Sequence, residues 1–223
     1  MIPGTFKLDQ KAADTSEAEL RISETGAYVG TIVQADIYES NGGATFVRFF
    51  FRREDDGATA WVQQCIFKTD GTESFGFGIF HAVMACAGIT GVTTQAGKVR
   101  IPGGTIVNGH RMRELESKRV GLLLVTDPRE YRDKSGAIKV ATDLILKRPF
   151  EAATGRTSKE MAAGSEPKRI ASDLEYAQAN PRPIRRLDVA SGGYAATAAR
   201  PASAPASSPN LPPAPLPEED VPF

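Results

Sequence analysis

The sequence predicts a mainly β domain that carries one helix and is followed by a long tail without a core of its own. Two observations predict this division. Residues 25–150 hold nearly all of the aromatic and β-branched residues, and these alternate with polar residues as in half-buried strands. Residues 192–217 are mostly Ala, Pro, Ser and Gly, a composition that buries too little apolar surface to offset the entropy of ordering.

Three predicted strands open the domain. The segment "AYVGTIVQADIYES" alternates and is rich in β-branched residues, and the "NGG" that follows supplies turn residues. The segments "ATFVRFFFRRE" and "ATAWVQQCIFK" predict the second and third strands, with "DDG" as the turn between them. Short turns between consecutive strands indicate an antiparallel meander.

A helix and a last hairpin complete the predicted domain. The segment "FGFGIFHAVMACAGI" has too much Ala and Met for a strand and predicts a buried helix from about Gly78 to Ala87. A loop-rich stretch, "PGGTIVNGHRMRELESK", follows, and "RVGLLLVTDPREYRD", "KSGA" and "IKVATDLILKRP" predict a hairpin. Three strands, a helix and two strands are the order of the five-stranded OB-fold barrel. An α+β sheet with the helix packed on one face is the alternative.

The chain therefore has four expected parts. Residues 1–24 form an acidic N-terminal arm with a short helix at "TSEAELRI", and residues 25–150 form the OB-fold domain. Residues 151–217 are expected to be a flexible linker rich in Pro, Ala and Ser. One short helix, Ile170 to Ala179, fits the sequence before "NPRP" inside this linker. Residues 218–223 form an acidic tip.

The overall charge hides a separation of sign. The chain has 27 Lys and Arg residues and 27 Asp and Glu residues, but residues 25–150 have 16 against 13, a net formal charge of +3. The excess acids lie in the arm and the tip. The expected domain is therefore mildly basic, and its two ends are acidic.

Several kinds of site are not expected. Two cysteines without a CxxC pattern and two scattered histidines predict no metal site, and no cofactor motif is present. The sequence lacks a phosphate-binding Gly-rich loop before a helix, a nucleophile elbow and a cluster of acids at strand ends, so we expect no enzyme. The N-terminus lacks the layout of a signal peptide and no apolar stretch is long enough to span a bilayer, which predicts a soluble cytoplasmic protein.

The second strand provides the main candidate binding surface. At a period of two, the expected core face carries Val47, Phe49 and Phe51. The expected solvent face carries Phe46, Arg48, Phe50 and Arg52. Exposed rings that alternate with guanidinium groups would stack the bases and meet the phosphates of a single strand. The alternative is that Phe46 and Phe50 pack beneath the helix or the 103–117 loop.

Neighbouring segments extend this candidate surface. The matching face of the first strand carries Tyr28, Ile32, Gln34 and Tyr38, and the third strand offers Trp61 and Gln63. In "NGHRMRE", the cations beside His110 form either a solvated loop or a phosphate clamp. The last hairpin carries Arg129 near its tip, where OB-fold loops flank the binding face. The predicted DNA-binding residues are Tyr28, Tyr38, Phe46, Arg48, Phe50, Arg52, Trp61, Arg111, Arg113, Tyr131, Arg132 and Lys134.

The chain end resembles a known family. "EEDVPF" is similar to the tip of bacterial single-stranded DNA-binding proteins, which end in acids followed by Ile-Pro-Phe, and the Pro/Ala-rich linker resembles theirs. The domain, with "YVGTIVQADIYES" leading to "FGFGIFHAVMACAGIT", is more similar to the single-stranded DNA-binding proteins of some bacteriophages. This chain departs from the bacterial tip in having Glu-Glu-Asp-Val where that tip is mostly Asp, then Ile.

The resemblance implies a non-catalytic protein that coats single-stranded DNA in replication, recombination or repair. If a phage encodes it, this protein acts in the cytoplasm of the bacterial host. A homo-oligomer is compatible with this function. It implies that a tip recruits partner enzymes through Glu218, Glu219, Asp220, Val221, Pro222 and Phe223. A ring and an α-carboxylate on Phe223 suit a pocket that holds an arginine. The alternatives are a tip that only solubilises, a barrel that binds protein as an adaptor, and, less favoured, a nuclease or annealing factor.

Overall fold

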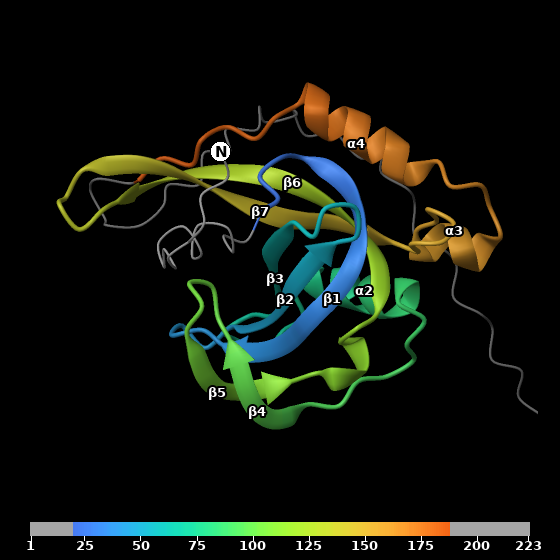
Figure 1. The fold of residues 1–223 in the computed structure, drawn as a ribbon, viewed down its shortest axis with the longest axis horizontal. Coiled ribbons are helices and arrows are strands. Elements are labelled where there is room, and N and C mark those ends of the chain that lie inside the picture. The colour runs from blue at the N-terminus through green and yellow to red at the C-terminus, as the bar shows by residue number, and fades with distance from the viewer. Residues whose placement is uncertain (1–19, 188–223) are drawn as a thin grey trace, which may run out of the picture.

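The computed structural model describes residues 20–187 (Figure 1). This part of the chain is mainly β, with one antiparallel seven-stranded sheet and three α-helices. In chain order its elements are β1 (Gly26–Glu39), β2 (Thr45–Arg53), β3 (Thr59–Phe67), α2 (Phe75–Cys86), β4 (Gln95–Arg100), β5 (Ile106–Arg111), the 3₁₀ turn η1 (Arg113–Leu115), β6 (Arg119–Arg132), β7 (Ile138–Phe150), α3 (Ser158–Ala163) and α4 (Arg169–Ala179). Between residues 20 and 187, no helix is long and apolar enough to cross a membrane.

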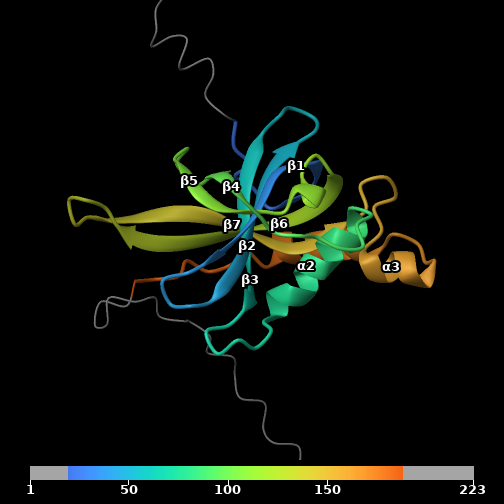
Figure 2. The same ribbon diagram turned by 90° about the horizontal axis from the view of Figure 1, so that it is seen from below.

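Strand β1 organises the sheet because it pairs with three other strands. Along one edge it pairs with β2, which pairs with β3. Along the other edge its first half pairs with β6 and its second half with β5. Within the described residues β7 pairs only with β6, so the sheet is open, and the five-stranded count of the sequence prediction is wrong. The β6–β7 hairpin extends beyond the rest of the sheet, away from α2 and α3, in both views (Figure 1, Figure 2).

The main core lies between the inner face of the sheet and α2. As predicted, Val47, Phe49 and Phe51 of β2 are fully buried in it. Helix α2 begins three residues earlier than expected because the Ser74 hydroxyl caps it by accepting a hydrogen bond from the Gly76 N–H. A Cβ on Gly76 would lie 2.2 Å from the Cys65 carbonyl oxygen, so glycine lets α2 approach β3 this closely.

The segment predicted to be a loop contains a hairpin instead. Strands β4 and β5 pair over their full length, from Gln95 opposite Arg111 to Arg100 opposite Ile106. The alternation of apolar and polar residues is weak here because most of these side chains are exposed on both faces. The turn contains Gly103 and Gly104, both with positive φ angles, which glycine adopts without strain. Periodicity therefore gave no strand signal.

Residues 151–187 correct the expected linker. They form α3 and α4, and the predicted helix from Ile170 to Ala179 is confirmed apart from one residue at its start. Ile170 and Leu174 lie on one side of α4 and pack against Leu123 and Phe150 on the outer face of the sheet. This second small core explains why the segment is ordered. The remaining linker, 188–217, and the tip, 218–223, lie outside the described residues.

The expected N-terminal arm also contributes to the domain. Arg21 forms a parallel bridge with Thr59 of β3, and Ile22 is buried in the main core. Residues 20–22 are therefore extended and not the end of the predicted helix. The rest of that helix prediction falls on residues outside the described part of the chain.

Candidate nucleic-acid interface

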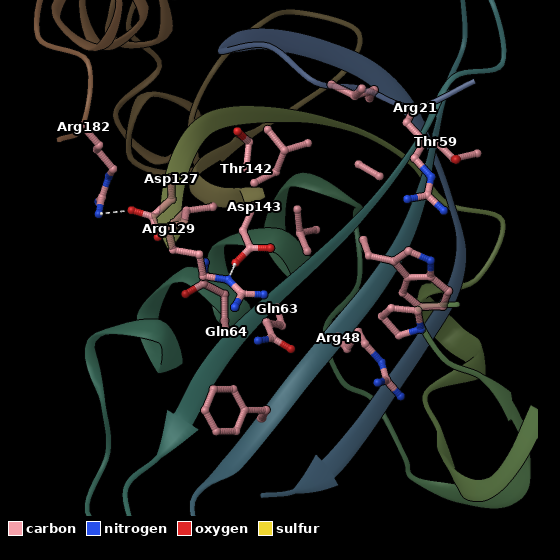
Figure 3. Close-up of a pocket in the computed structure, with 18 of the residues that line it drawn as sticks. Arg21, Arg48, Thr59, Gln63, Gln64, Asp127, Arg129, Thr142, Asp143 and Arg182 are labelled. Atoms are coloured by element: carbon pink, nitrogen blue, oxygen red, sulfur yellow. Dashed lines mark hydrogen bonds and ion pairs between the residues drawn. The ribbon is translucent and has the colours of Figure 1, made fainter. Parts of the chain in front are cut away.

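A cleft of about 720 Å³ runs between β2–β3 and the base of the β6–β7 hairpin (Figure 3). We call its first side the β2–β3 wall, which is made of Phe46, Arg48, Trp61 and Gln63. The opposite side, the hairpin wall, is made of Asp127, Arg129, Asp143, Arg182 and Arg185. Arg21 also lines the cleft, which brings the total to five arginines and two aspartates. An anionic ligand therefore suits the cleft better than a cationic one.

Aromatic rings give the β2–β3 wall its shape. Phe46 stacks on Tyr38 with a centroid distance of 5.5 Å and an interplanar angle of 17°. The Tyr38 hydroxyl donates a hydrogen bond of 2.7 Å to Gln63 Oε1. Burial raises the pKa of Tyr38 while the nearby Arg48 opposes the rise, so the hydroxyl stays a donor at neutral pH. Phe46 and Trp61 are both partly exposed, which leaves ring surface open to a stacking partner.

Phe50 does not have the exposed position that the sequence pattern predicted. Its ring is only 3% exposed, and it stacks beneath Trp61 at a centroid distance of 4.6 Å. The unexpected β4 strand covers it, because the Arg100 guanidinium carbon lies 5.4 Å from the ring centroid. Phe50 therefore packs against the Trp61 ring and is not itself a platform for a base.

Arg48 lines the cleft, but its charge is neutralised. It forms a two-pronged ion pair with Asp36, at 2.7 Å from Nη2 to Oδ2 and 3.3 Å from Nε to Oδ1. Asp36 is almost fully buried and also accepts a 2.9 Å hydrogen bond from the Gln34 amide. The Arg48 guanidinium lies 4.8 Å from the Tyr38 centroid and 5.6 Å from the Trp61 centroid. Arg48 thus fixes the spacing of two rings more than it offers a free charge.

A β-bulge at residue 33 separates two tyrosines that the period of two had placed on one face. Ile32 pairs with Phe51 and Gln34 pairs with Phe50, so one residue of β1 is unmatched. Tyr28 and Ile32 therefore lie on the core side, and Gln34 and Tyr38 lie on the opposite side. The expectation that Tyr28 belongs to the binding face is wrong. Its hydroxyl donates to the Glu24 carbonyl, far along the strand from Tyr38.

The remaining predicted cations lie outside the cleft. Arg52 is exposed at the far end of β2, and no ion pair to it is found among the described residues. Arg111, on β5, forms a two-pronged ion pair with Glu116, which raises the pKa of the guanidinium. Arg113 is exposed in η1. Neither Arg111 nor Arg113 lines the cleft, so the expected phosphate clamp is not part of it.

A second hollow of about 780 Å³ lies on the other side of Tyr38. Its lining includes Lys98, Asn108 and His110 from the β4–β5 hairpin. Because Tyr38 lines this hollow and stacks on Phe46, the two hollows share one aromatic pair. His110 lines this hollow, and Arg111, opposite Asp36 in the strand register, lies on the sheet face that carries Arg48.

The β6–β7 hairpin carries its predicted residues beyond the cleft. Tyr131 is half-buried, and Arg132 and Lys134 are exposed near the turn. Sequence reasoning missed the groups at the base of this hairpin that line the cleft, namely Asp127, Asp143, Arg182 and Arg185. Arg182 and Arg185 lie in the basic segment "NPRPIRRLD", whose charge was the available signal. This segment falls within the stretch that the sequence predicts to be a linker.

Residues 20–187 contain no group of three His, Cys, Asp or Glu side chains placed to hold a metal ion. Burial raises the pKa of the Cys86 thiol to about 11, which keeps it protonated and unreactive at neutral pH. No protein-family model matches the chain, and no curated protein matches it.

Proposed function

We propose that this chain is a non-catalytic single-stranded DNA-binding protein. One observation carries the proposal: the partly exposed rings of Phe46 and Trp61 lie in a cleft that five arginines line. Stacked aromatic platforms beside cations are the means by which proteins hold single strands without reading sequence, at roughly 1–3 kcal/mol per stacked base. A paired duplex cannot present its base faces to such rings.

The strand connections support an OB-fold as the finer description of the domain. Strands β1, β2 and β3 form a meander, α2 follows, and β6 then pairs with β1 and β7. The Gln64 side chain of β3 donates a 2.8 Å hydrogen bond to the Leu146 carbonyl of β7, so the two ends of the sheet lie close together. In this interpretation β4 and β5 are an insertion, and the cleft lies on the second and third strands, where OB-folds bind oligonucleotides.

The tip would connect the coated strand to other enzymes. Glu218 to Phe223 combine three acids with an aromatic ring. A basic groove with an apolar pocket on a replication, recombination or repair enzyme would bind these groups. The resemblance to the tips of bacterial single-stranded DNA-binding proteins supports this part of the proposal.

A binding titration of the full chain tests the proposal. We expect a labelled single-stranded oligonucleotide to bind more tightly than the same sequence as a duplex, with an affinity that falls steeply as salt rises. A scrambled oligonucleotide of the same composition should bind within tenfold, because stacking on aromatic rings tolerates any base. Equal binding to both forms, or no binding, would reject the proposal and favour a protein adaptor.

A further inference from the structure

The segment after α4 lies against the edge of the β6–β7 hairpin. We call residues 181–187 the strap. The Arg185 N–H donates to the Pro128 carbonyl and the Glu130 N–H donates to the Arg185 carbonyl, both at 2.9 Å. The Leu187 N–H donates to Glu130 Oε2 at 3.2 Å. These bonds make the strap a short parallel addition to β6, visible in Figure 1 as the orange segment beside the hairpin.

The strap brings two guanidinium groups to one carboxylate of the cleft. Asp127, on β6, is almost fully buried and forms ion pairs with Arg182 at 3.3 Å and with Arg185 at 2.5 Å. One carboxylate meets two guanidinium groups, so the three side chains carry a net formal charge of +1. The Arg182 side chain is 50% exposed and lines the cleft beside Arg129 (Figure 3).

The strap also buries little surface. Its two prolines, Pro181 and Pro183, have no N–H group to donate to β6. Ile184 is 45% exposed and so contributes little buried surface. A segment with little burial opens more readily than the sheet beneath it. A ligand that contacts the strap and the β2–β3 wall together would favour the docked position.

We infer that the strap is the phosphate-binding side of the interface, and that single-stranded DNA fixes it against β6. Arg182 takes a backbone phosphate of the strand whose bases stack on Phe46 and Trp61, while Arg185 keeps Asp127 neutralised. A guanidinium group suits this task because it can direct two N–H groups at one phosphate. The inference rests on the proposed function, and it assigns the phosphate contact to a segment that the sequence had placed in the linker.

Arg182→Gln tests the phosphate contact in the full chain. A plot of log affinity against log salt concentration has a negative slope, and each phosphate contact to a single strand makes it steeper by about 0.7. Between 50 and 200 mM salt the wild type should lose affinity about 2.6-fold more than the variant, by the same relation. Arg186→Gln is the matched control, because Arg186 is an exposed arginine of the strap that does not line the cleft. Its slope should equal the wild-type slope.

Hydrogen exchange tests the coupling separately. Saturating single-stranded oligonucleotide should slow exchange of the Arg185 and Leu187 amides severalfold, and a duplex of the same sequence should not. Equal salt slopes for wild type, Arg182→Gln and Arg186→Gln, or an equal loss of slope in both variants, would overturn the phosphate assignment. Unchanged strap exchange would overturn the coupling. In either case a retained preference for single strands would leave the proposed function standing, whereas no binding by the wild type would reject both.

Discussion

The two walls of the cleft differ in how their charges are held. On the β2–β3 wall, Arg48 is matched one to one with buried Asp36 and lies between aromatic rings. On the hairpin wall, Arg182 and Arg185 share one aspartate and remain half-exposed. The first wall therefore offers ring surface without net charge, and the second offers charge without rings.

This difference separates two contributions to binding that the sequence pattern had combined. Phe46 and Arg48 alternate along one strand and looked like a single stacking and phosphate surface. In the fold the rings of the β2–β3 wall and the arginines of the hairpin wall lie on opposite sides of the cleft. Affinity at high salt should therefore depend on the β2–β3 wall, and the salt dependence should depend on the hairpin wall.

The largest expected effect is on stability and comes from the ion pair within the β2–β3 wall. Arg48→Ala leaves Asp36 buried without its counter-charge, which costs about 3 kcal/mol of folding free energy. We expect a clear fall in the denaturant midpoint measured by circular dichroism. Arg52→Ala is the control on the same strand, since Arg52 is exposed, and its midpoint should stay at the wild-type value. Equal midpoints for the two variants would contradict the role given to Asp36.

The next effect is on affinity and comes from the rings. Phe46→Ala should weaken single-strand binding by about 1–3 kcal/mol, because it removes one stacking platform. The salt slope should stay unchanged, because no charge is lost. Tyr131→Ala, on the distal hairpin, should weaken binding less. A larger loss in Tyr131→Ala than in Phe46→Ala would move the stacking site away from the β2–β3 wall.

The C-terminal helices should detach at low pH. Burial raises the pKa of Glu160, but hydrogen bonds from the N–H groups of Thr157, Arg169 and Lys168 outweigh it and hold the pKa at about 2. A carboxylate with a lowered pKa stabilises the fold fully above its ordinary value of 4.5, and this stability is lost as the pH falls toward 2.

Limited proteolysis with an acid-stable protease can follow this loss. Cleavage between residues 151 and 180 should increase between pH 4.5 and 2 in the wild type. Glu160→Gln should show increased cleavage already at neutral pH, since its amide cannot accept all three of these hydrogen bonds and weakens helix caps worth about 1 kcal/mol each. Identical pH profiles for the two proteins would show that other carboxylates control the transition.

The smallest expected effect concerns Arg52. If the strand follows β2 to its end, Arg52→Ala should lower the salt slope by about 0.7, the value for one phosphate contact. The fold should be unaffected. An unchanged slope would confine the bound strand to the cleft and remove Arg52 from the interface.

The sequence predicted those elements whose side-chain pattern follows from burial. The β2 core residues obey the expected period of two, and the three-strand meander, α2 and α4 form where the sequence predicted them. The β4–β5 hairpin escaped prediction because both of its faces are largely exposed, so no apolar alternation marks it. The bulge at residue 33 was not predicted. One extra residue there moves the side chains on one side of the bulge to the opposite face of the sheet from the one that the period of two predicts.

The candidate site was predicted for the rings of β2 and β3 and not for its charges. Phe46, Arg48 and Trp61 share one face because Arg48 pairs with Gln63 and Phe50 pairs with Trp61 across neighbouring strands. Asp127 and Arg182 are 55 residues apart, and only the packing of α4 on the sheet brings them together. No local pattern encodes that contact.

Trp61 allows a direct test of the central claim, that bases stack on the β2–β3 wall. It is the sole tryptophan in the chain, so the intrinsic fluorescence of the protein reports on this one ring. Titration with a single-stranded oligonucleotide should quench the emission in step with binding followed by anisotropy, while inorganic tripolyphosphate and a matched duplex should leave it nearly unchanged. Binding without quenching, or equal quenching by tripolyphosphate, would contradict base stacking in the cleft.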